Sequence, residues 1–173
     1  MYIKLIGATL ILFSGTSIGW ILSNIYINRI KELKELQLAL SILETEISYG
    51  QTVLPEALKK TSKLINKSFE ELFYDSAEKL KKSRQDSFAE IWEQQIKKYN
   101  RKCDLNQQDL EILINWGQQI GCSDLESQIK INQLALKRLE QQEEKAHEIA
   151  RKKVKIVRYA GVLISLMVII LFY

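Results

Sequence analysis

The placement of charged residues constrains this chain more than any other feature. No charged side chain lies from Leu5 to Asn28 or from Tyr159 to Tyr173, and all 21 acidic residues lie between these apolar ends. At 1.5 Å per helical residue, Leu5 to Ile27 extends over roughly 34 Å, enough to cross a hydrocarbon core of about 30 Å. The pattern therefore predicts a membrane-spanning helix at each end of the chain.

The first apolar stretch has a rival interpretation as a cleaved signal peptide. Lys4 precedes it, and small residues follow at positions 14–17, as near a cleavage site. Hydrophobicity resumes after these residues and continues to Ile27, whereas the apolar region of a signal peptide is shorter and ends at its cleavage site. We therefore expect residues 1–28 to be retained as a membrane helix.

The second apolar stretch is shorter, and it reaches a spanning length only if it begins at Val154. Lys155 and Arg158 would then extend their charged ends toward the lipid headgroups. Aromatic residues stand near both ends of this stretch, as in many membrane helices. We expect the C-terminal membrane helix to cover residues 154–173.

Basic residues beside the two stretches predict the orientation of the chain. Positive charge follows the first stretch at Arg29, Lys31 and Lys34, and nothing charged follows the second. A cluster precedes the second stretch and could also attract anionic lipid; it consists of Arg151, Lys152, Lys153, Lys155 and Arg158. Because basic residues favour the cytoplasmic side, residues 29–158 are expected in the cytoplasm.

The polar middle of the chain, residues 29–153, is expected to be entirely helical. Apolar residues recur at steps of three and four, and no useful length alternates with period two. We expect a six-helix cytosolic bundle whose first and last helices continue into the membrane helices. The residues that mark its first five helices are Leu33 to Ile47, Pro55 to Ile65, Phe69 to Leu80, Ser87 to Ile96 and Asn106 to Gly121, and Ser123 starts the last.

The expected core contains Trp92, Trp116, Phe69 and Phe73. Two segments, Ser87 to Glu90 and Ser123 to Glu126, have the spacing of a capping box, in which the first and fourth residues satisfy each other's backbone donors. Leu125, Ile129, Leu136 and Leu139 form the apolar stripe of the last helix.

Small residues in the two apolar stretches suggest how the membrane helices pack. Gly15 and Gly19 form one step of four residues, and Gly161 and Ser165 form another. Small residues let helix backbones approach closely in lipid, so we expect an antiparallel pair with Gly19 near Ser165 in depth. The alternative is that glycine is merely common in membrane helices.

The sequence contains no recognisable catalytic constellation. It lacks glycine-rich phosphate motifs, and its one histidine, His147, has no second histidine to form a metal pair. Cys103 and Cys122 fit no metal-ligand spacing and are expected to be reduced and partly buried. The nearly balanced charge of the middle region excludes a nucleic-acid-binding face. We therefore expect no enzyme activity, cofactor, metal or small-molecule substrate.

Leu43 to Gly50, followed by Leu54 to Leu58, is the most distinctive segment of the sequence. With the further segments below, it resembles the stage III sporulation protein AB family, and the resemblance covers the whole chain. Cys122 stands where that family more usually has a small or polar residue. Further matching segments are Lys4 to Ala8, Trp116-Gly117, Gly121 to Asp124 with Gln128, and the basic cluster before the last apolar stretch.

The resemblance implies a fold, a location and a set of partners. The family belongs to endospore-forming bacteria, and its cytosolic domain is similar to that of the type II secretion F and type IV pilus platform proteins. It implies a scaffold in the channel complex between mother cell and forespore, in the mother-cell membrane that surrounds the forespore. The implied partners are a cytosolic secretion-type ATPase, stage III sporulation protein AA, and other membrane subunits.

A platform of this kind needs a face for its partner, and the first corner of the bundle is the expected place. The candidate partner-binding residues are Glu44, Glu46, Gly50 and Pro55. The alternative is that Gly50 and Pro55 serve only the turn, while Glu46 forms a local salt bridge. Two other classes of function remain open, a membrane-tethered coiled-coil regulator or sensor and a membrane enzyme that uses His147.

Overall fold

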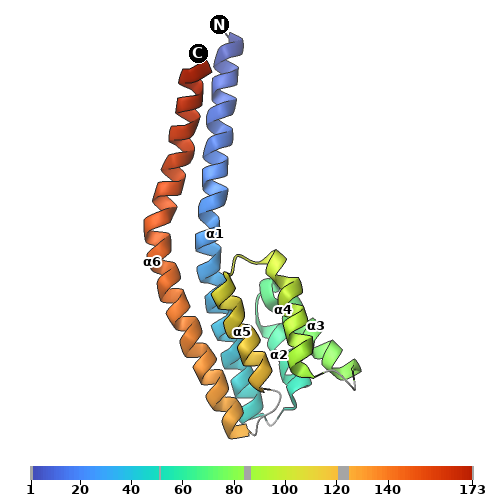
Figure 1. Cartoon of the computed structure of the whole chain (residues 1–173). Coiled ribbons are helices and arrows are strands. Elements are labelled where there is room, and N and C mark those ends of the chain that lie inside the picture. The colour runs from blue at the N-terminus through green and yellow to red at the C-terminus, as the bar shows by residue number, and fades with distance from the viewer. Residues whose placement is uncertain (1, 51, 84–86, 121–124, 173) are drawn as a thin grey trace. The chain divides into compact units, whose positions relative to one another are not determined.

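The chain folds entirely into helices in a computed structural model that describes residues 2–50, 52–83, 87–120 and 125–172. No strand occurs in these ranges, so the all-α expectation is confirmed. Figure 1 shows the helices in order along the chain: α1 (Tyr2–Ser48), α2 (Leu54–Leu64), α3 (Lys67–Lys82), α4 (Phe88–Tyr99), the short 3-10 helix η1 (Asn100–Lys102), α5 (Gln107–Ile120) and α6 (Leu125–Phe172).

The helices belong to two compact units. Residues 1–30 and 145–173 form one unit, here called the helix pair, and residues 31–144 form the other, here called the bundle. Helices α1 and α6 each contribute to both units, so residues 145–153 group with the apolar C-terminal stretch and not with the polar domain.

In the helix pair, the beginning of α1 and the end of α6 run antiparallel, with both chain ends at the same end of the pair (Figure 1). Both helices are long and apolar enough to cross a membrane. Only 11% of the apolar window in α1 and 6% of that in α6 is buried inside the protein. A core helix of a water-soluble protein would be mostly buried, whereas these two apolar windows are mostly exposed.

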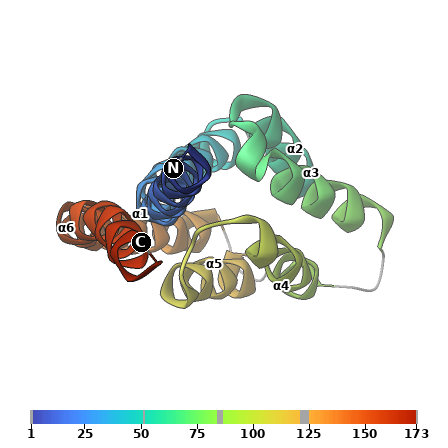
Figure 2. The same ribbon diagram turned by 90° about the horizontal axis from the view of Figure 1, so that it is seen from above.

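The bundle surrounds a core of aliphatic and aromatic side chains. The expected stripe of α1 is buried from Leu33 to Ile47, and the four expected aromatic residues are at most 1% exposed. Seen from above in Figure 2, α2 and α3 form one hairpin and α4 and α5 form the next, with α3 packed against α4. The indole of Trp92 lies at the centre of the aromatic cluster, 5.0 Å from Trp116 and 5.4 Å from Phe73 between ring centroids.

A glycine creates the space that Trp92 occupies. A Cβ atom on Gly117 would lie 2.1 Å from Cδ1 of Trp92, far inside van der Waals contact. The indole cannot easily move away, because its Nε1 donates a hydrogen bond to the carbonyl of Leu113 at 2.8 Å. Helices α4 and α5 therefore pack closely only because residue 117 has no side chain.

Helix starts are largely where the sequence places them. Ser87 and Glu90 form the expected capping box at the start of α4. At the start of α5, Asn106 and Asp109 exchange hydrogen bonds in the same reciprocal way, both at 2.9 Å. The second expected box and Gly121 lie largely outside the described residues, although α6 does begin at Leu125.

Two features of the bundle depart from the apolar pattern of the sequence. Leu64, within the expected helix from Pro55 to Ile65, is 63% exposed at the C-terminal end of α2, whereas Ile65 after it is buried. Helix η1, which follows α4 directly, has no signal in the apolar pattern, since none of its three residues is buried.

Candidate functional site

The corner between α1 and α2 contains three of the four candidate partner-binding residues. Helix α1 ends at Ser48, and the amide of Thr52 donates to the carbonyl of Glu46 at 3.2 Å. A Cβ atom on Gly50 would lie 2.6 Å from that same carbonyl oxygen, so the turn leaves no space for a side chain. Pro55 lies in the first turn of α2, where its missing N–H costs nothing.

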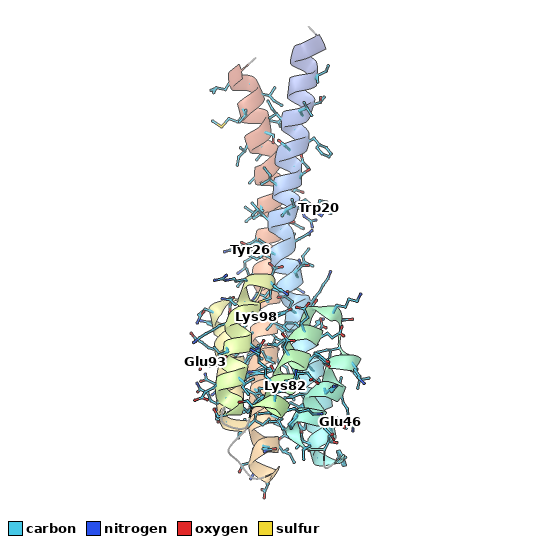
Figure 3. The ribbon with its side chains drawn as sticks, turned by 90° about the vertical axis from the view of Figure 1, so that its right-hand side faces the viewer. Trp20, Tyr26, Glu46, Lys82, Glu93 and Lys98 are labelled. Atoms are coloured by element: carbon cyan, nitrogen blue, oxygen red, sulfur yellow. The ribbon has the colours of Figure 1, made fainter. Side chains whose placement is uncertain are left out.

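Glu46 connects the two helices of this corner and carries a label in Figure 3. Its Oε2 accepts hydrogen bonds from Nζ of Lys60 at 2.6 Å and from Oγ1 of Thr52 at 3.1 Å. The hydrogen bond from Lys60 holds the pKa of Glu46 below its usual value. The local salt bridge of the alternative interpretation is therefore present, and Glu46 uses one carboxylate oxygen to maintain the turn.

Glu44 belongs to a different network, which joins α1 to α6 and α5. Its Oε2 accepts a hydrogen bond from Nδ2 of Asn132 at 2.9 Å, and its Oε1 accepts one from Gln133 at 3.2 Å. Asn132 is only 2% exposed; it also donates to the carbonyl of Leu40 and accepts from Nε1 of Trp116 at 3.0 Å. Glu44 thus forms the outer end of a buried hydrogen-bond network that passes through Asn132 to Trp116.

A groove lies beside this hydrogen-bond network, between the end of α1, the end of α5 and the start of α6. Ser48 is one of its lining residues, but the Ser48 hydroxyl is buried beneath the groove surface and has no hydrogen-bond partner in the described part of the chain. The exposed surface of the groove is apolar, and the carboxylate of Glu44 at its edge accepts hydrogen bonds from Asn132 and Gln133. Its lining residues are Glu44, Ile47, Ser48, Ile120, Gln128, Ile129 and Asn132.

Sequence reasoning missed Asn132, although a signal was available. Asn132 lies between Ile129 and Leu136 on the apolar stripe of α6, at the spacing of an inward position. A lone asparagine at such a position often fixes register through a buried hydrogen bond. Ser48 gave no comparable signal, because its burial depends on helices distant in sequence.

The small residues of the helix pair lie at the contact between its two backbones. A Cβ atom on Gly161 would lie 2.6 Å from the carbonyl oxygen of Gly15 and 3.1 Å from Cα of Gly19. Ser165 is 3% exposed, and a Cβ atom on Gly15 would collide with its hydroxyl. The register differs from the expected one, since Ser165 lies against Gly15 while Gly19 lies against Gly161.

The five basic residues before the C-terminal stretch lie in the helix pair. Arg151, Lys152 and Lys155 are exposed and form no ion pair with any described residue. Lys153 lies over the ring of Tyr26, 5.8 Å from its centroid, and Arg158 lies over the ring of Trp20 at 4.3 Å. Figure 3 shows Trp20 and Tyr26 on different sides of α1.

One carboxyl of the bundle has an unusual protonation equilibrium. Burial raises the pKa of Glu32 to about 7, and neighbouring Asp104, Glu35 and Asp109 add to the effect. The backbone N–H of Asp104 opposes it by donating to Oε2 of Glu32 at 2.9 Å. Glu35, on the next turn, has a buried Oε1 without a partner in the described residues.

The groups considered for chemistry in the sequence do not assemble into a site. No group of three His, Cys, Asp or Glu residues that could hold a metal occurs within the described ranges. Cys103 is a half-buried free thiol whose pKa is raised by burial, and Cys122 lies outside the described residues. His147 is exposed on α6.

These features define a class: an all-helical protein with two apolar helices of membrane-spanning length and a polar bundle between them in sequence. The sequence model of the stage III sporulation protein AB family matches residues 4–173, and the chain belongs to that family. It is 34% identical over 169 residues to stage III sporulation protein AB of Bacillus subtilis (strain 168), covering 98% of both chains. A solved structure of stage III sporulation protein AB (SpoIIIAB) is similar with a TM-score of 0.66 and 33% identity, over 71% of this chain and 96% of that one.

Proposed function

We propose that this chain is a two-pass membrane scaffold of the channel complex between mother cell and forespore, with residues 29–153 in the cytoplasm. Its place would be the mother-cell membrane around the forespore, and its role that of a platform for a secretion-type ATPase, stage III sporulation protein AA. Family membership supports the sporulation role. The exposed apolar surface of the helix pair and the basic residues beside it support the membrane placement.

The observation that carries the platform proposal is the groove at the meeting of α1, α5 and α6. A scaffold subunit needs a preformed surface for its partner, and the groove offers apolar walls where three helices meet. The nearby corner of Glu46 and Gly50 gives the groove a fixed edge, because the ion pair with Lys60 holds the turn. Tyr49 and Val53 add exposed apolar surface beside it, at 88% and 64% exposure.

The coiled-coil regulator receives no support from the bundle. Parallel dimerisation through α6 would need a free apolar stripe on that helix. Asn132, Ala135 and Leu139 are instead buried within the same chain, at 4% exposure or less. We therefore argue only the scaffold function.

The proposal is tested by binding of the full-length chain in nanodiscs to purified stage III sporulation protein AA, with ATP, with ADP and without nucleotide. Ile129→Asp places a charge in the groove and should weaken binding by about 10-fold, equivalent to about 1.4 kcal/mol. Leu134→Asp, an exposed apolar position on the same helix, should change it less than about 2-fold. Absence of binding by the unmodified chain under all three conditions would contradict the platform role.

A further inference from the structure

Arg158 is held in the helix pair by two contacts with α1. Its Nε donates a hydrogen bond to Oγ of Ser23 at 3.0 Å, and its guanidinium carbon lies 4.3 Å from the centroid of the Trp20 ring. Ser23 is fully buried, and its own hydroxyl hydrogen is used by the carbonyl of Trp20 at 2.8 Å. The guanidinium is therefore fixed on one side by a buried acceptor and on one face by an aromatic ring.

The outer part of this guanidinium has no partner. Its two terminal nitrogens donate to no acceptor among the described residues, and the arginine is only half-buried. Two parallel N–H groups on a planar fork match two oxygens of a phosphate, which a lysine ammonium cannot do. Trp20 is 55% exposed, so the fork is reached from the outer surface of the pair, where Figure 3 shows the Trp20 side chain.

The depth of Arg158 and the positive charge of the region favour an anion from outside the chain as its partner. Arg158 lies four residues after Val154, about 6 Å into the expected C-terminal membrane helix, so that its long side chain reaches the headgroup level. A cation at that depth is costly unless it is paired. The two segments of the helix pair contain eight basic residues and one acidic residue, Glu148, for a net charge of +7.

We propose that Arg158 and Trp20 form a binding site for the phosphate of an anionic phospholipid headgroup, with Ser23 orienting the arginine. The phosphate accepts two hydrogen bonds from the guanidinium fork, and the indole lies against the upper part of the acyl chains. This site rests on the membrane placement proposed above. It differs from diffuse attraction to the exposed cluster at 151–155, because it depends on one oriented side chain.

The test is native mass spectrometry of the delipidated full-length chain in neutral detergent, titrated with phosphatidylglycerol and with phosphatidylcholine. We expect one phosphatidylglycerol to bind in preference to phosphatidylcholine. Arg158→Gln should weaken this binding by about 10-fold, and Arg158→Lys by several-fold, since lysine keeps the charge and loses the fork. Lys152→Gln removes the same charge from an exposed site and should weaken binding by less than about 2-fold.

Equal weakening in Arg158→Gln and Lys152→Gln would overturn the site. Displacement of the lipid by inorganic phosphate at equal concentration would overturn the lipid as its ligand. Ser23→Ala retains every charge and should weaken binding to an intermediate extent, which keeps the test open if Arg158→Gln fails to fold. Alkaline extraction separates this proposal from the previous one: a chain released from membranes contradicts the membrane placement, whereas an embedded chain without lipid preference contradicts only the site.

Discussion

The helix pair and the bundle are stabilised by different physical means, although the same two helices contribute to both. In the helix pair, backbones approach where Gly15, Gly19 and Gly161 leave out side chains, and most large apolar residues face outward. In the bundle, large aromatic and aliphatic groups fill the interior. Charge divides the same way: the segments of the helix pair carry +7, and residues 31–144, with 17 basic and 20 acidic residues, carry −3.

A glycine has a different structural role in each unit. In the helix pair, glycine lets two main chains touch, and in the proposed membrane placement this contact would replace the hydrophobic effect, which is absent between helices in lipid. In the bundle, Gly117 accommodates a side chain whose burial in water is itself stabilising. Gly7 provides a control for both, since a Cβ atom there would meet nothing within 4 Å.

The largest expected effect is at Gly117. Gly117→Ala should destabilise the bundle by about 2–3 kcal/mol, because the new methyl group overlaps the Trp92 indole, which is anchored by its hydrogen bond to Leu113. Denaturant unfolding followed by near-ultraviolet circular dichroism measures this. Gly7→Ala should leave the same transition unchanged, and equal transitions for the two variants would show that α4 and α5 can separate without cost.

The second largest expected change in stability concerns the buried hydrogen-bond network of Asn132. Asn132→Leu should cost about 2 kcal/mol, because it leaves the indole N–H of Trp116 buried without an acceptor and removes one hydrogen bond from Glu44. Gln133→Ala removes only the exposed contact with Glu44 and should cost less than about 0.5 kcal/mol. A more stable Asn132→Leu variant would mean that the network contributes specificity at the expense of stability.

In the helix pair, Gly161→Leu should separate the two helices with little effect on the bundle. Spin labels on cysteines at positions 10 and 170, in a chain with Cys103 and Cys122 replaced by serine, report the distance. We expect it to increase by about 2 Å, because the new side chain meets the backbone of Gly15. Gly7→Leu is the matched control, and an unchanged distance in both variants would argue against close packing.

The smallest effect is a pH dependence confined to the bundle. The pKa of Glu32 is about 7 in the folded chain against 4.5 for an ordinary glutamate, so the folded state binds this proton more tightly. Stability from this group is present at low pH and is lost as pH rises from about 4.5 to 7. At pH 8, Glu32→Gln should be more stable than the unmodified chain by about 1 kcal/mol, discounted for partial solvent access.

The control for this dependence has the opposite sign. Lys60 lowers the pKa of Glu46, so the contribution of Glu46 is present above its ordinary pKa and is lost as pH falls below it. Glu46→Gln should therefore slightly destabilise the chain at neutral pH, and the difference should disappear in acid. Parallel melting curves for both variants at pH 3, pH 5 and pH 8 decide the signs.

The sequence predicts those parts of the molecule that depend on local periodicity. The stripe from Leu33 to Ile47, the capping box at Ser87 and the cap at Asn106 each involve residues within one helix, and the structure confirms them. The two apolar stretches are equally easy to recognise in the sequence, because a membrane-spanning length requires many apolar residues in succession.

Features that depend on contacts between distant segments could not be predicted in the same way. The register of the helix pair differs by one helical turn from the expected one, since glycine spacing alone allows either pairing. The fit of Trp92 against Gly117 and the burial of Ser48 require knowledge of which helices are neighbours. Of the candidate partner-binding residues, Glu44 lines the groove, whereas Glu46 is occupied by its ion pair.

The distribution of the three tryptophans gives the molecule two separate optical reporters. Trp92 and Trp116 are buried with an angle of 65° between their rings, close enough for their electronic transitions to couple. Their coupled signal in circular dichroism should vanish when the bundle unfolds. Trp20, exposed on the helix pair, should instead be quenched by brominated acyl chains. The unmodified chain can thus report the folding of one unit and the lipid contact of the other in a single sample.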